Sequence, residues 1–422
     1  MPDWLQSEMG ELSHLEFHLN TEEANLAKFE HFVVGIKAAS GKKYRELLSV
    51  IPKTRYDYVL IAPWIKLGGA DLAILHHLSY LSRHGKDVLL VLTEPELSTR
   101  LDRVPGEVDI LEFGRHVNDL MFDEQRHLLD RLLIEFAPDV IHVVNSRLGW
   151  YSLKVSGTAI SSVSDVYVSL YCDDIDSAGC PVGYGREFLV PSFPYIKRVI
   201  TDNSVYVETL RKAFGLPKEK FAVVRLPTDE KLLELEVDHS DKSQDILWCG
   251  RLDAQKRPEL LVQISRLLPN VNFHVYGQVV TGNNNDIARE LIERPNIKLH
   301  EPFDRFIDVA REYRVILNTS AWDGLPNILV EAAAAGLLII TSDVGGISDL
   351  VTQTTGYVVV NHSEPGEYVK CIEACLEDPA KSLEKVVGAR EQIKKHHTRL
   401  AFDRSMTELL EADPVGHLLE TV

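Results

Sequence analysis

Two basic residues follow an apolar run in the second half of the chain. Arg251 and Lys256 stand in CGRLDAQKRPELL (Cys249–Leu261), between a predicted strand and a helix that begins with a proline. Loops that follow parallel strands open into the ligand cleft of the sheet, where two cations would neutralise a diphosphate. Because the chain has a net charge of −18, we prefer this role over a solvated surface pair. Arg257 is better explained as surface charge.

A turn that carries a carboxylate leads directly into a helix in AWDGLPNILVEAAAAG (Ala321–Gly336). Pro326 near the first helical position predicts a helix start whose free N–H groups and positive dipole end can face an anion. Asp323 in the turn and Glu331 eight residues later would place two acceptors beside a hydroxyl-rich ligand. The spacing leaves a second interpretation open, in which Asp323 only caps the helix and Glu331 lies on its surface.

Two Gly–Gly turns also follow predicted strands. Gly68 and Gly69 lie in LGGAD (Leu67–Asp71), and another pair lies in SDVGGISDL (Ser342–Leu350). Paired glycines let backbone N–H groups approach an anion closely, but a tight turn explains each pair equally well. Neither is a G-x-G-x-x-G, so the fingerprint of a nicotinamide-dependent dehydrogenase is absent.

A histidine and five cysteines have less specific patterns. His142 ends the predicted strand in DVIHVVNS and can line a cleft, although a satisfied core histidine is the preferred interpretation. The cysteines are scattered and form no C-x-x-C pair of a zinc site. We therefore expect free thiols in a reducing compartment.

The elements that must position these residues alternate between strand and helix from Tyr56 onward. YDYVLIAPW, a glycine loop, DLAILHHLSYLSRHG and KDVLLVLTEP form a βαβ unit, which predicts a parallel sheet. A charged stretch at 228–243 interrupts the alternation, which resumes from DILWCGRL. The pattern therefore predicts an α/β protein of two doubly wound, Rossmann-like domains, with residues 1–50 as a helical N-terminal extension.

Composition excludes several classes of function. The 422 residues include 45% hydrophobic and 26% charged residues, which is typical of a globular chain. The 45 basic and 63 acidic residues make the protein acidic, so nucleic acid is not an expected partner. The N-terminus lacks the apolar core of a signal peptide, and no apolar stretch approaches the roughly 20 residues of a membrane span. Membrane contact would be peripheral.

The motifs resemble, in the right order, those of the retaining GT-B-fold glycosyltransferases of family 4 (glycosyl transferases group 1). GGADLAILHHLSYLSRHGKDV is similar to the family's N-terminal loop and first helix, and GRLDAQKRPELL, DGLPNILVEAAAAG and SDVGGISDLV are similar to its donor-site motifs. The resemblance covers about residues 55–410. It implies an acceptor-side domain over 51–235, a nucleotide-sugar-binding domain over 236–385, a cleft between them, and a crossover helix over 386–422 that returns to the first domain.

The resemblance also implies a nucleotide-diphosphate-sugar donor and a hydroxyl acceptor, with no metal or other cofactor. Arg251 and Lys256 match the family's diphosphate-binding pair. Asp323 and Glu331 match its E-x7-E pair, the first near the hydroxyls of the donor sugar and the second on the ribose. The other substrate-binding candidates, besides His142, lie in loops on the two sides of the cleft: Gly68 and Gly69 in the N-terminal loop, and Gly250, Gly324, Leu325, Pro326 and Asn327 in the donor-site motifs.

Three departures from the family pattern bear on the chemistry. Asp323 stands where Glu is usual and is one methylene shorter, which allows a different donor or weaker catalysis. The strand VYVSLYCDD lacks a histidine that many relatives carry and has Tyr-Cys-Asp at 171–173 instead. Asp174 and Asp176 form a D-x-D, the metal signature of the other large glycosyltransferase fold. We expect no metal there, because the two cations take the metal's role.

The resemblance implies sugar transfer, in bacterial surface polysaccharide or glycan biosynthesis. Two alternatives stay open: a non-catalytic GT-B binding or scaffold subunit of a polysaccharide-assembly complex, and another GT-B enzyme such as a sugar-nucleotide epimerase. The expected partners are the donor and a glycan or lipid-linked acceptor, in the cytoplasm or peripherally at the inner face of the plasma membrane. A homo-oligomer through the N-terminal extension is a further possibility. The basic clusters GKKYR and KKHHTR fit solvated helix faces better than a membrane contact.

Overall fold

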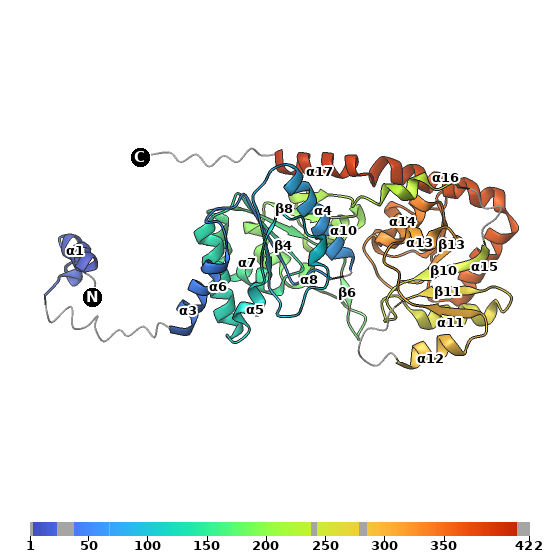
Figure 1. Ribbon diagram of the computed structural model, residues 1–422, viewed down its shortest axis with the longest axis horizontal. Coiled ribbons are helices and arrows are strands. Elements are labelled where there is room, and N and C mark those ends of the chain that lie inside the picture. Colours follow the sequence, from blue (N-terminus) through green and yellow to red (C-terminus); the bar gives the residue numbers. More distant parts are fainter. Residues whose placement is uncertain (1–2, 23–37, 67, 238–242, 278–284, 412–422) are drawn as a thin grey trace.

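The computed structural model describes residues 3–22, 38–66, 68–237, 243–277 and 285–411. They form two domains, each built on one parallel sheet, which lie side by side along the long axis of the molecule (Figure 1). The predicted pair of doubly wound α/β domains is therefore confirmed. No helix among the described residues is long and apolar enough to cross a membrane.

The first sheet has seven parallel strands in the order β3-β2-β1-β4-β5-β8-β9. Its strands are Tyr58–Ala62 (β1), Val88–Leu92 (β2), Asp109–Leu111 (β3), Val140–Val144 (β4), Asp165–Ser169 (β5), Arg198–Thr201 (β8) and Phe221–Val223 (β9). Strand β1 is buried along its whole length. Alternate residues of β1 join one of two hydrophobic clusters, so both faces of the sheet are covered.

Helices pack on both faces of this sheet. One face carries α3 (Ala38–Val50), α6 (Phe122–Phe136), α7 (Arg147–Ser161) and α10 (Ser204–Phe214), whose apolar residues form one cluster with the strands. The other face carries α4 (Gly69–Arg83). Tyr44 and Leu47 of α3 lie in the core of the first domain. The end of the predicted extension is therefore part of that domain. Helix α1 (Asp3–Leu12) is also present, whereas residues 23–37 of the extension lie outside the described residues.

The second sheet has six parallel strands in the order β12-β11-β10-β13-β14-β15. Its strands are Ser243–Cys249 (β10), Phe273–Tyr276 (β11), Ile297–His300 (β12), Tyr313–Asn318 (β13), Leu338–Ser342 (β14) and Tyr357–Val359 (β15). Its helices are α11 (Pro258–Leu267), α12 (Asn285–Glu293), α13 (Ile307–Ala310), α14 (Asn327–Ala335), α15 (Pro365–Glu377) and α16 (Pro379–His396). Helices α14 and α16 share one cluster, and α11 and α15 share the other.

A last helix returns to the first domain. Helix α16 packs on the second domain through Ala389 and Ile393, and α17 (Arg399–Glu411) packs on the first (Figure 1). Phe402, buried with Met406 and Leu409, joins the cluster around α4. Asp403 receives two hydrogen bonds from Arg83 of α4, each 2.8 Å long. The chain therefore passes from the second domain in α16 to the first domain in α17.

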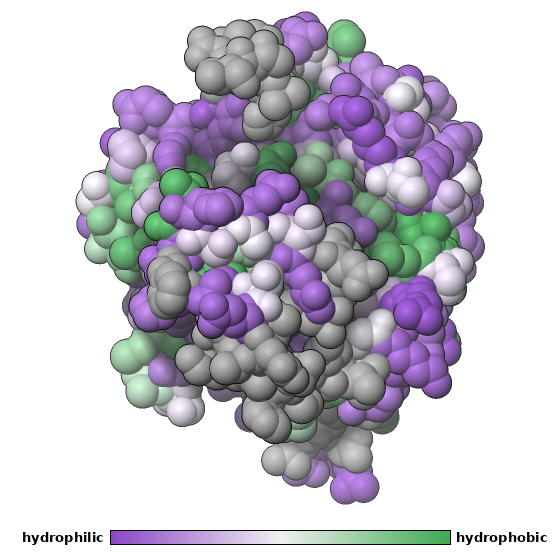
Figure 2. Space-filling model, turned by 90° about the vertical axis from the view of Figure 1, so that its left-hand side faces the viewer, coloured by the Kyte–Doolittle hydropathy of each residue, from purple (hydrophilic) through white to green (hydrophobic). Residues whose placement is uncertain are grey.

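Figure 2 shows the end of the molecule on which the first domain lies. Among the coloured atoms of this face, hydrophilic residues are more widespread than hydrophobic ones, which are visible mainly toward its two sides. Large exposed apolar side chains of the domain include Met121, Phe122, Val155 and Val190. Apolar side chains of this kind, scattered singly, are ordinary on a protein surface.

Candidate active site between the domains

The centre of the candidate site is an ion pair between the two predicted donor-site motifs. Lys256 lies in the loop between β10 and α11, and its Nζ is 2.5 Å from Oδ2 of Asp323. Both side chains are largely buried, with exposed fractions of 14% and 13%. The hydroxyl of Ser320 donates to the same carboxylate oxygen at 3.0 Å. The topology brings these residues together because β10 and β13 are neighbours in the sheet.

Arg251 is linked to the turn through the side chain of Gln255. Its Nε lies 2.8 Å from Asp253 Oδ2, and its guanidinium donates to Gln255 Oε1 at 2.7 Å. Gln255 in turn donates from Nε2 to the carbonyl of Trp322 at 3.0 Å. The Arg251 side chain is 59% exposed, so it lies at the rim, whereas Lys256 lies inside. Sequence reasoning did not single out Gln255.

Arg257 is not the surface charge that the sequence suggested. Its guanidinium donates to the carbonyl oxygens of Thr319 at 2.6 Å and Ser320 at 3.1 Å, and to the hydroxyl of Tyr368 at 3.3 Å. Its backbone has a φ of 50°, in the left-handed region that disfavours side chains with a Cβ. Arg257 therefore has a strained backbone conformation, and its side chain holds Thr319 and Ser320, which precede Asp323 in the chain.

The turn at 323–327 presents backbone to the cleft. Leu325 is 5% exposed and belongs to the core of the second domain, and Pro326 is also buried. Helix α14 begins at Asn327, directly after Pro326. The free N–H groups of its first turn and its positive dipole end therefore lie beside the ion pair. Because these two side chains are buried, Leu325 and Pro326 can offer a ligand chiefly their backbone.

Glu331 lies on α14, one turn beyond Asn327. Burial raises the pKa of its carboxyl to about 7, and the carboxylate of Asp229 adds to the shift. Arg103, from the first domain, acts in the opposite direction. A carboxyl kept partly protonated near neutral pH, with a cation of the other domain nearby, is placed to change its charge when a ligand fills the cleft.

The N-terminal glycine loop faces the same helix start. Gly68 precedes α4 as its N-cap, and a Cβ built on Gly69 would lie 3.4 Å from Nδ2 of Asn327. Gly250 packs equally closely on the second domain's side, since a Cβ there would lie 3.2 Å from Cγ of Lys256. Leu67, the first residue of the loop motif, lies outside the described residues.

His142 lies in the core of the first domain. It has no exposed surface, and its ring nitrogens lie 2.9 Å from the hydroxyl of Tyr58 and 2.8 Å from that of Ser169. Burial holds the pKa of the ring well below its ordinary value. The position favours the core-histidine interpretation over a role in lining the cleft.

The D-x-D segment has a local role in a small hairpin. Asp174 pairs with Val182 across its two short strands, β6 (Asp174–Ile175) and β7 (Pro181–Val182). Asp176 accepts the backbone N–H groups of Ala178 and Cys180 and so closes the turn. Within the described part of the chain, no three His, Cys, Asp or Glu side chains are grouped so that they could hold a metal ion.

A pocket of about 290 Å³ opens between the domains beside this site. The first domain contributes Tyr171, Cys172, Asp173, Ile175, Val205, Tyr206 and Thr209, and the second contributes Ala321, Trp322, Asp323, Val344, Gly345 and Gly346. The residues that line this pocket include the carboxylates of Asp173 and Asp323. Burial, together with the carboxylate of Asp323, raises the pKa of the nearby Asp202 to about 7.

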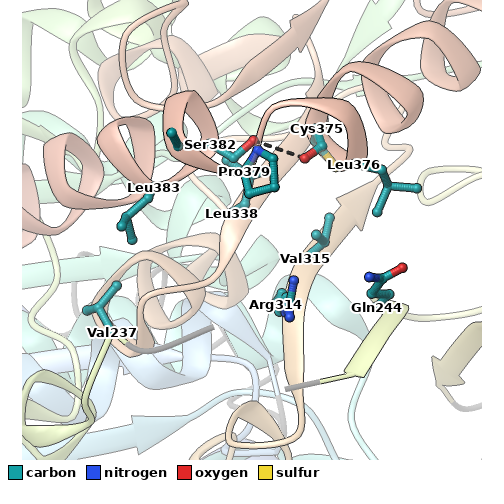
Figure 3. Close-up of a pocket in the computed structure, with 11 residues that line it drawn as sticks. Val237, Gln244, Arg314, Val315, Leu338, Cys375, Leu376, Pro379, Ser382 and Leu383 are labelled. Carbon is teal, nitrogen blue, oxygen red and sulfur yellow. Dashed lines mark hydrogen bonds between the residues drawn. The ribbon is translucent and has the colours of Figure 1, made fainter. Parts of the chain in front are cut away.

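A second pocket, of about 440 Å³, lies at the other end of the second sheet (Figure 3). Its lining includes Gln244, Arg314 and Leu338, which stand at or near the starts of their strands, and apolar residues of α15 and α16. Ligands of doubly wound sheets bind at the carboxyl ends of strands. This pocket is therefore separate from the candidate active site.

The sequence and structure comparisons agree on one class of protein. Residues 243–378 match the family model described as Glycosyl transferases group 1. D-inositol 3-phosphate glycosyltransferase of Nocardiopsis dassonvillei is 24% identical over 213 residues, which are 47% of this chain and 46% of the relative. The O-antigen biosynthesis glycosyltransferase WbnH of Escherichia coli is 30% identical over 118 residues, 28% of this chain and 33% of the relative. The chain thus matches about half or less of the length of these curated relatives.

Solved structures match over a larger share of the chain. The structure of Anabaena Alr3699/HepE in complex with UDP and glucose has a TM-score of 0.68 at 16% identity, covering 85% of this chain and all of that one. The lipopolysaccharide outer core galactosyltransferase WaaB has a TM-score of 0.66 at 14% identity, covering 84% and 99%. The fold is that of the GT-B glycosyltransferases. The residues that match the glycosyl transferases group 1 model include the sheet of the second domain and the donor-site motifs.

Proposed function

We propose that this protein is a retaining, family 4 glycosyltransferase that moves a sugar from a nucleotide-diphosphate sugar to a hydroxyl acceptor. The observation that carries the proposal is the buried pair of Lys256 and Asp323, set beside the N-terminus of α14. A cation and a helix start suit a diphosphate, while the carboxylate suits the hydroxyls of a sugar. The glycosyltransferase relatives and the UDP-bound structural neighbour support the same assignment.

The proposed mechanism begins with an exchange of partners. The diphosphate replaces Asp323 as the ion-pair partner of the Lys256 ammonium. The Asp323 carboxylate is then free to accept hydrogen bonds from the sugar hydroxyls. As the glycosidic bond breaks, negative charge grows on the leaving phosphate, and Lys256, Arg251 and the α14 dipole stabilise it. The departing phosphate accepts the proton of the acceptor hydroxyl, which attacks the same face of the sugar and so retains its configuration. These groups supply the positive charge, so we propose that no metal or other cofactor takes part.

We further propose a role in surface polysaccharide or glycan biosynthesis, with a glycan or lipid-linked acceptor in the cytoplasm or at the inner membrane face. Relatives named for O-antigen and amylovoran biosynthesis support this pathway class. Asp323 in place of the usual Glu reaches both Lys256 and Ser320. The shorter side chain therefore still reaches the lysine that is proposed to bind the diphosphate.

The test is a panel of nucleotide-diphosphate sugars, assayed for nucleotide release with EDTA present. Lys256→Met should lower kcat/KM by about 10²–10³-fold, the loss typical of one group that stabilises developing charge. Lys298→Met, which removes an exposed lysine of β12, is the matched control and should keep wild-type turnover. Wild-type turnover in Lys256→Met would contradict the proposal. Donor binding without sugar transfer or hydrolysis would instead support a non-catalytic subunit.

A further inference from the structure

The first domain reaches both donor-site turns through three consecutive residues, Asp202–Ser204. They follow β8 at the carboxyl edge of the sheet and lead into α10. We propose that this segment, with Arg225, is an interdomain clamp whose members act as positioning residues for the donor. They hold the turn at 323–327 and the turn at 345–349 in place when the domains are closed. The inference rests on the proposed function, since the donor is what the turns would bind.

The strongest contact of the clamp centres on Asp349, the last residue of the short 3-10 helix η6 (Gly345–Asp349). One carboxylate oxygen accepts the backbone N–H of Ser204 at 2.7 Å and the guanidinium of Arg225 at 3.0 Å. The other oxygen accepts the Ser204 hydroxyl at 2.6 Å. The Asp349 side chain is only 8% exposed. A shielded carboxylate that binds a cation and the positive start of an 11-residue helix is held by charge-assisted bonds.

A second contact reaches the turn that carries Asp323. The carboxyl of Asp202 accepts the backbone N–H of Leu325 and, at 2.7 Å, the side-chain amide of Asn203. Asn203 also donates to the carbonyl of Tyr171 at 3.2 Å. A Cβ built on Gly324 would lie 2.9 Å from that same carbonyl oxygen. The backbone of the turn therefore lies directly against the first domain.

The two contacted turns also touch each other. Gly345 has a φ of 52°, and a Cβ there would lie only 1.8 Å from the carbonyl oxygen of Asp323. A Cβ on Gly346 would lie 2.3 Å from Cγ of Asn203. Such close approaches admit only glycine. A shift of Asp349 away from α10 is therefore transmitted to the backbone of Asp323.

The clamp predicts a specific kinetic signature. If the donor binds only to the closed arrangement, its apparent KM equals the intrinsic value divided by the closed fraction. A variant that opens the clamp should therefore raise the donor KM, while saturating donor closes the domains again and restores kcat. A merely structural defect would instead reduce the number of active molecules, which lowers kcat and leaves KM unchanged.

We would compare Asp349→Asn, Ser204→Ala and the double variant with Asp304→Asn, which removes an exposed carboxylate between β12 and α13 and serves as the control. Small-angle scattering would measure the radius of gyration without ligand and with saturating UDP. The Asp349→Asn protein should be more extended than wild type without ligand and should return to the wild-type size with UDP. Its donor KM should rise about tenfold with kcat within twofold, and the double variant should add little to Asp349→Asn alone.

An unchanged radius of gyration in ligand-free Asp349→Asn would overturn the clamp, as would a lower kcat at wild-type KM. The control should match wild type in every arm. The ligand-free scattering does not depend on catalysis. If no donor is turned over by wild type, the proposed function fails while the clamp is still tested; if the scattering is unchanged in an active enzyme, only the clamp fails.

Discussion

Glu331→Gln should make the protein more stable and at the same time weaken its binding of a nucleotide. The folded protein holds the pKa of Glu331 at about 7, against an ordinary value of 4.5, because burial and Asp229 disfavour the charged form. At a pH between 4.5 and about 7, Glu331 therefore binds more protons in the folded state than in the unfolded state. The contribution of Glu331 to the free energy of unfolding is therefore full below pH 4.5 and is lost as the pH rises through 7.

The size of the effect follows from this shift. Each pKa unit corresponds to about 1.4 kcal/mol. The shift therefore limits the gain in the free energy of unfolding by Glu331→Gln to about 3 kcal/mol above pH 7. Solvent at the partly exposed carboxyl screens the charge, and we expect about 1–1.5 kcal/mol. Glutamine has nearly the shape of the protonated side chain and carries no charge. Its stabilising effect should thus be near zero at pH 4.5 and full at pH 8.

The assay is urea unfolding of wild type and Glu331→Gln at both pH values. Glu373→Gln, on the exposed face of α15, is the control and should leave the free energy of unfolding unchanged. Calorimetric titration with UDP at pH 8 should show weaker binding by the Glu331→Gln protein, since the carboxylate is the proposed ribose acceptor. An equal change in stability at pH 4.5 and pH 8 would refute the electrostatic reasoning. Unchanged UDP affinity would refute the role in binding.

Two further variants test how the domains are held together. Gly346→Ala should force the domains apart, because its Cβ would lie 2.3 Å from Cγ of Asn203. The radius of gyration of the ligand-free protein should therefore increase. Gly366→Ala is the control, since Gly366 has open space around it, and this variant should leave the radius of gyration unchanged. Phe402→Ala should lower the free energy of unfolding by about 3–5 kcal/mol, since Phe402 is 2% exposed and joins α17 to the first domain. Urea unfolding measures this loss. A loss below about 1 kcal/mol would show that α17 is not anchored on the first domain.

Much of the fold is readable from the sequence because parallel strands are buried on both faces. Their continuous apolar runs identify β1, β10 and β14 and show that the polar motifs come directly after strands. The topology then places Lys256 and Asp323 at one edge. Helix α7 (147–161) was not predicted, because its sequence RLGWYSLKVSGTAIS interrupts the apolar spacing with glycine and polar residues.

Other parts of the site depend on geometry that spacing does not specify. The role of Arg257 follows from a left-handed backbone conformation, which a sequence with arginine there does not suggest. The clamp at Asp202 and Asp349 depends on how two separately patterned domains meet. Whether His142 faces the cleft or the core depends on the side chains of neighbouring strands, and Tyr58 and Ser169 occupy both of its nitrogens.

The central claim is that the site beside Lys256 binds the diphosphate of a nucleotide-sugar. A crystal structure of the protein grown with UDP tests it most directly. The account predicts the diphosphate within hydrogen-bond distance of the Lys256 ammonium and the first N–H groups of α14, with Asp323 released from the lysine. Diphosphate density elsewhere, for instance in the pocket of Figure 3, with the Lys256–Asp323 pair intact, would contradict it.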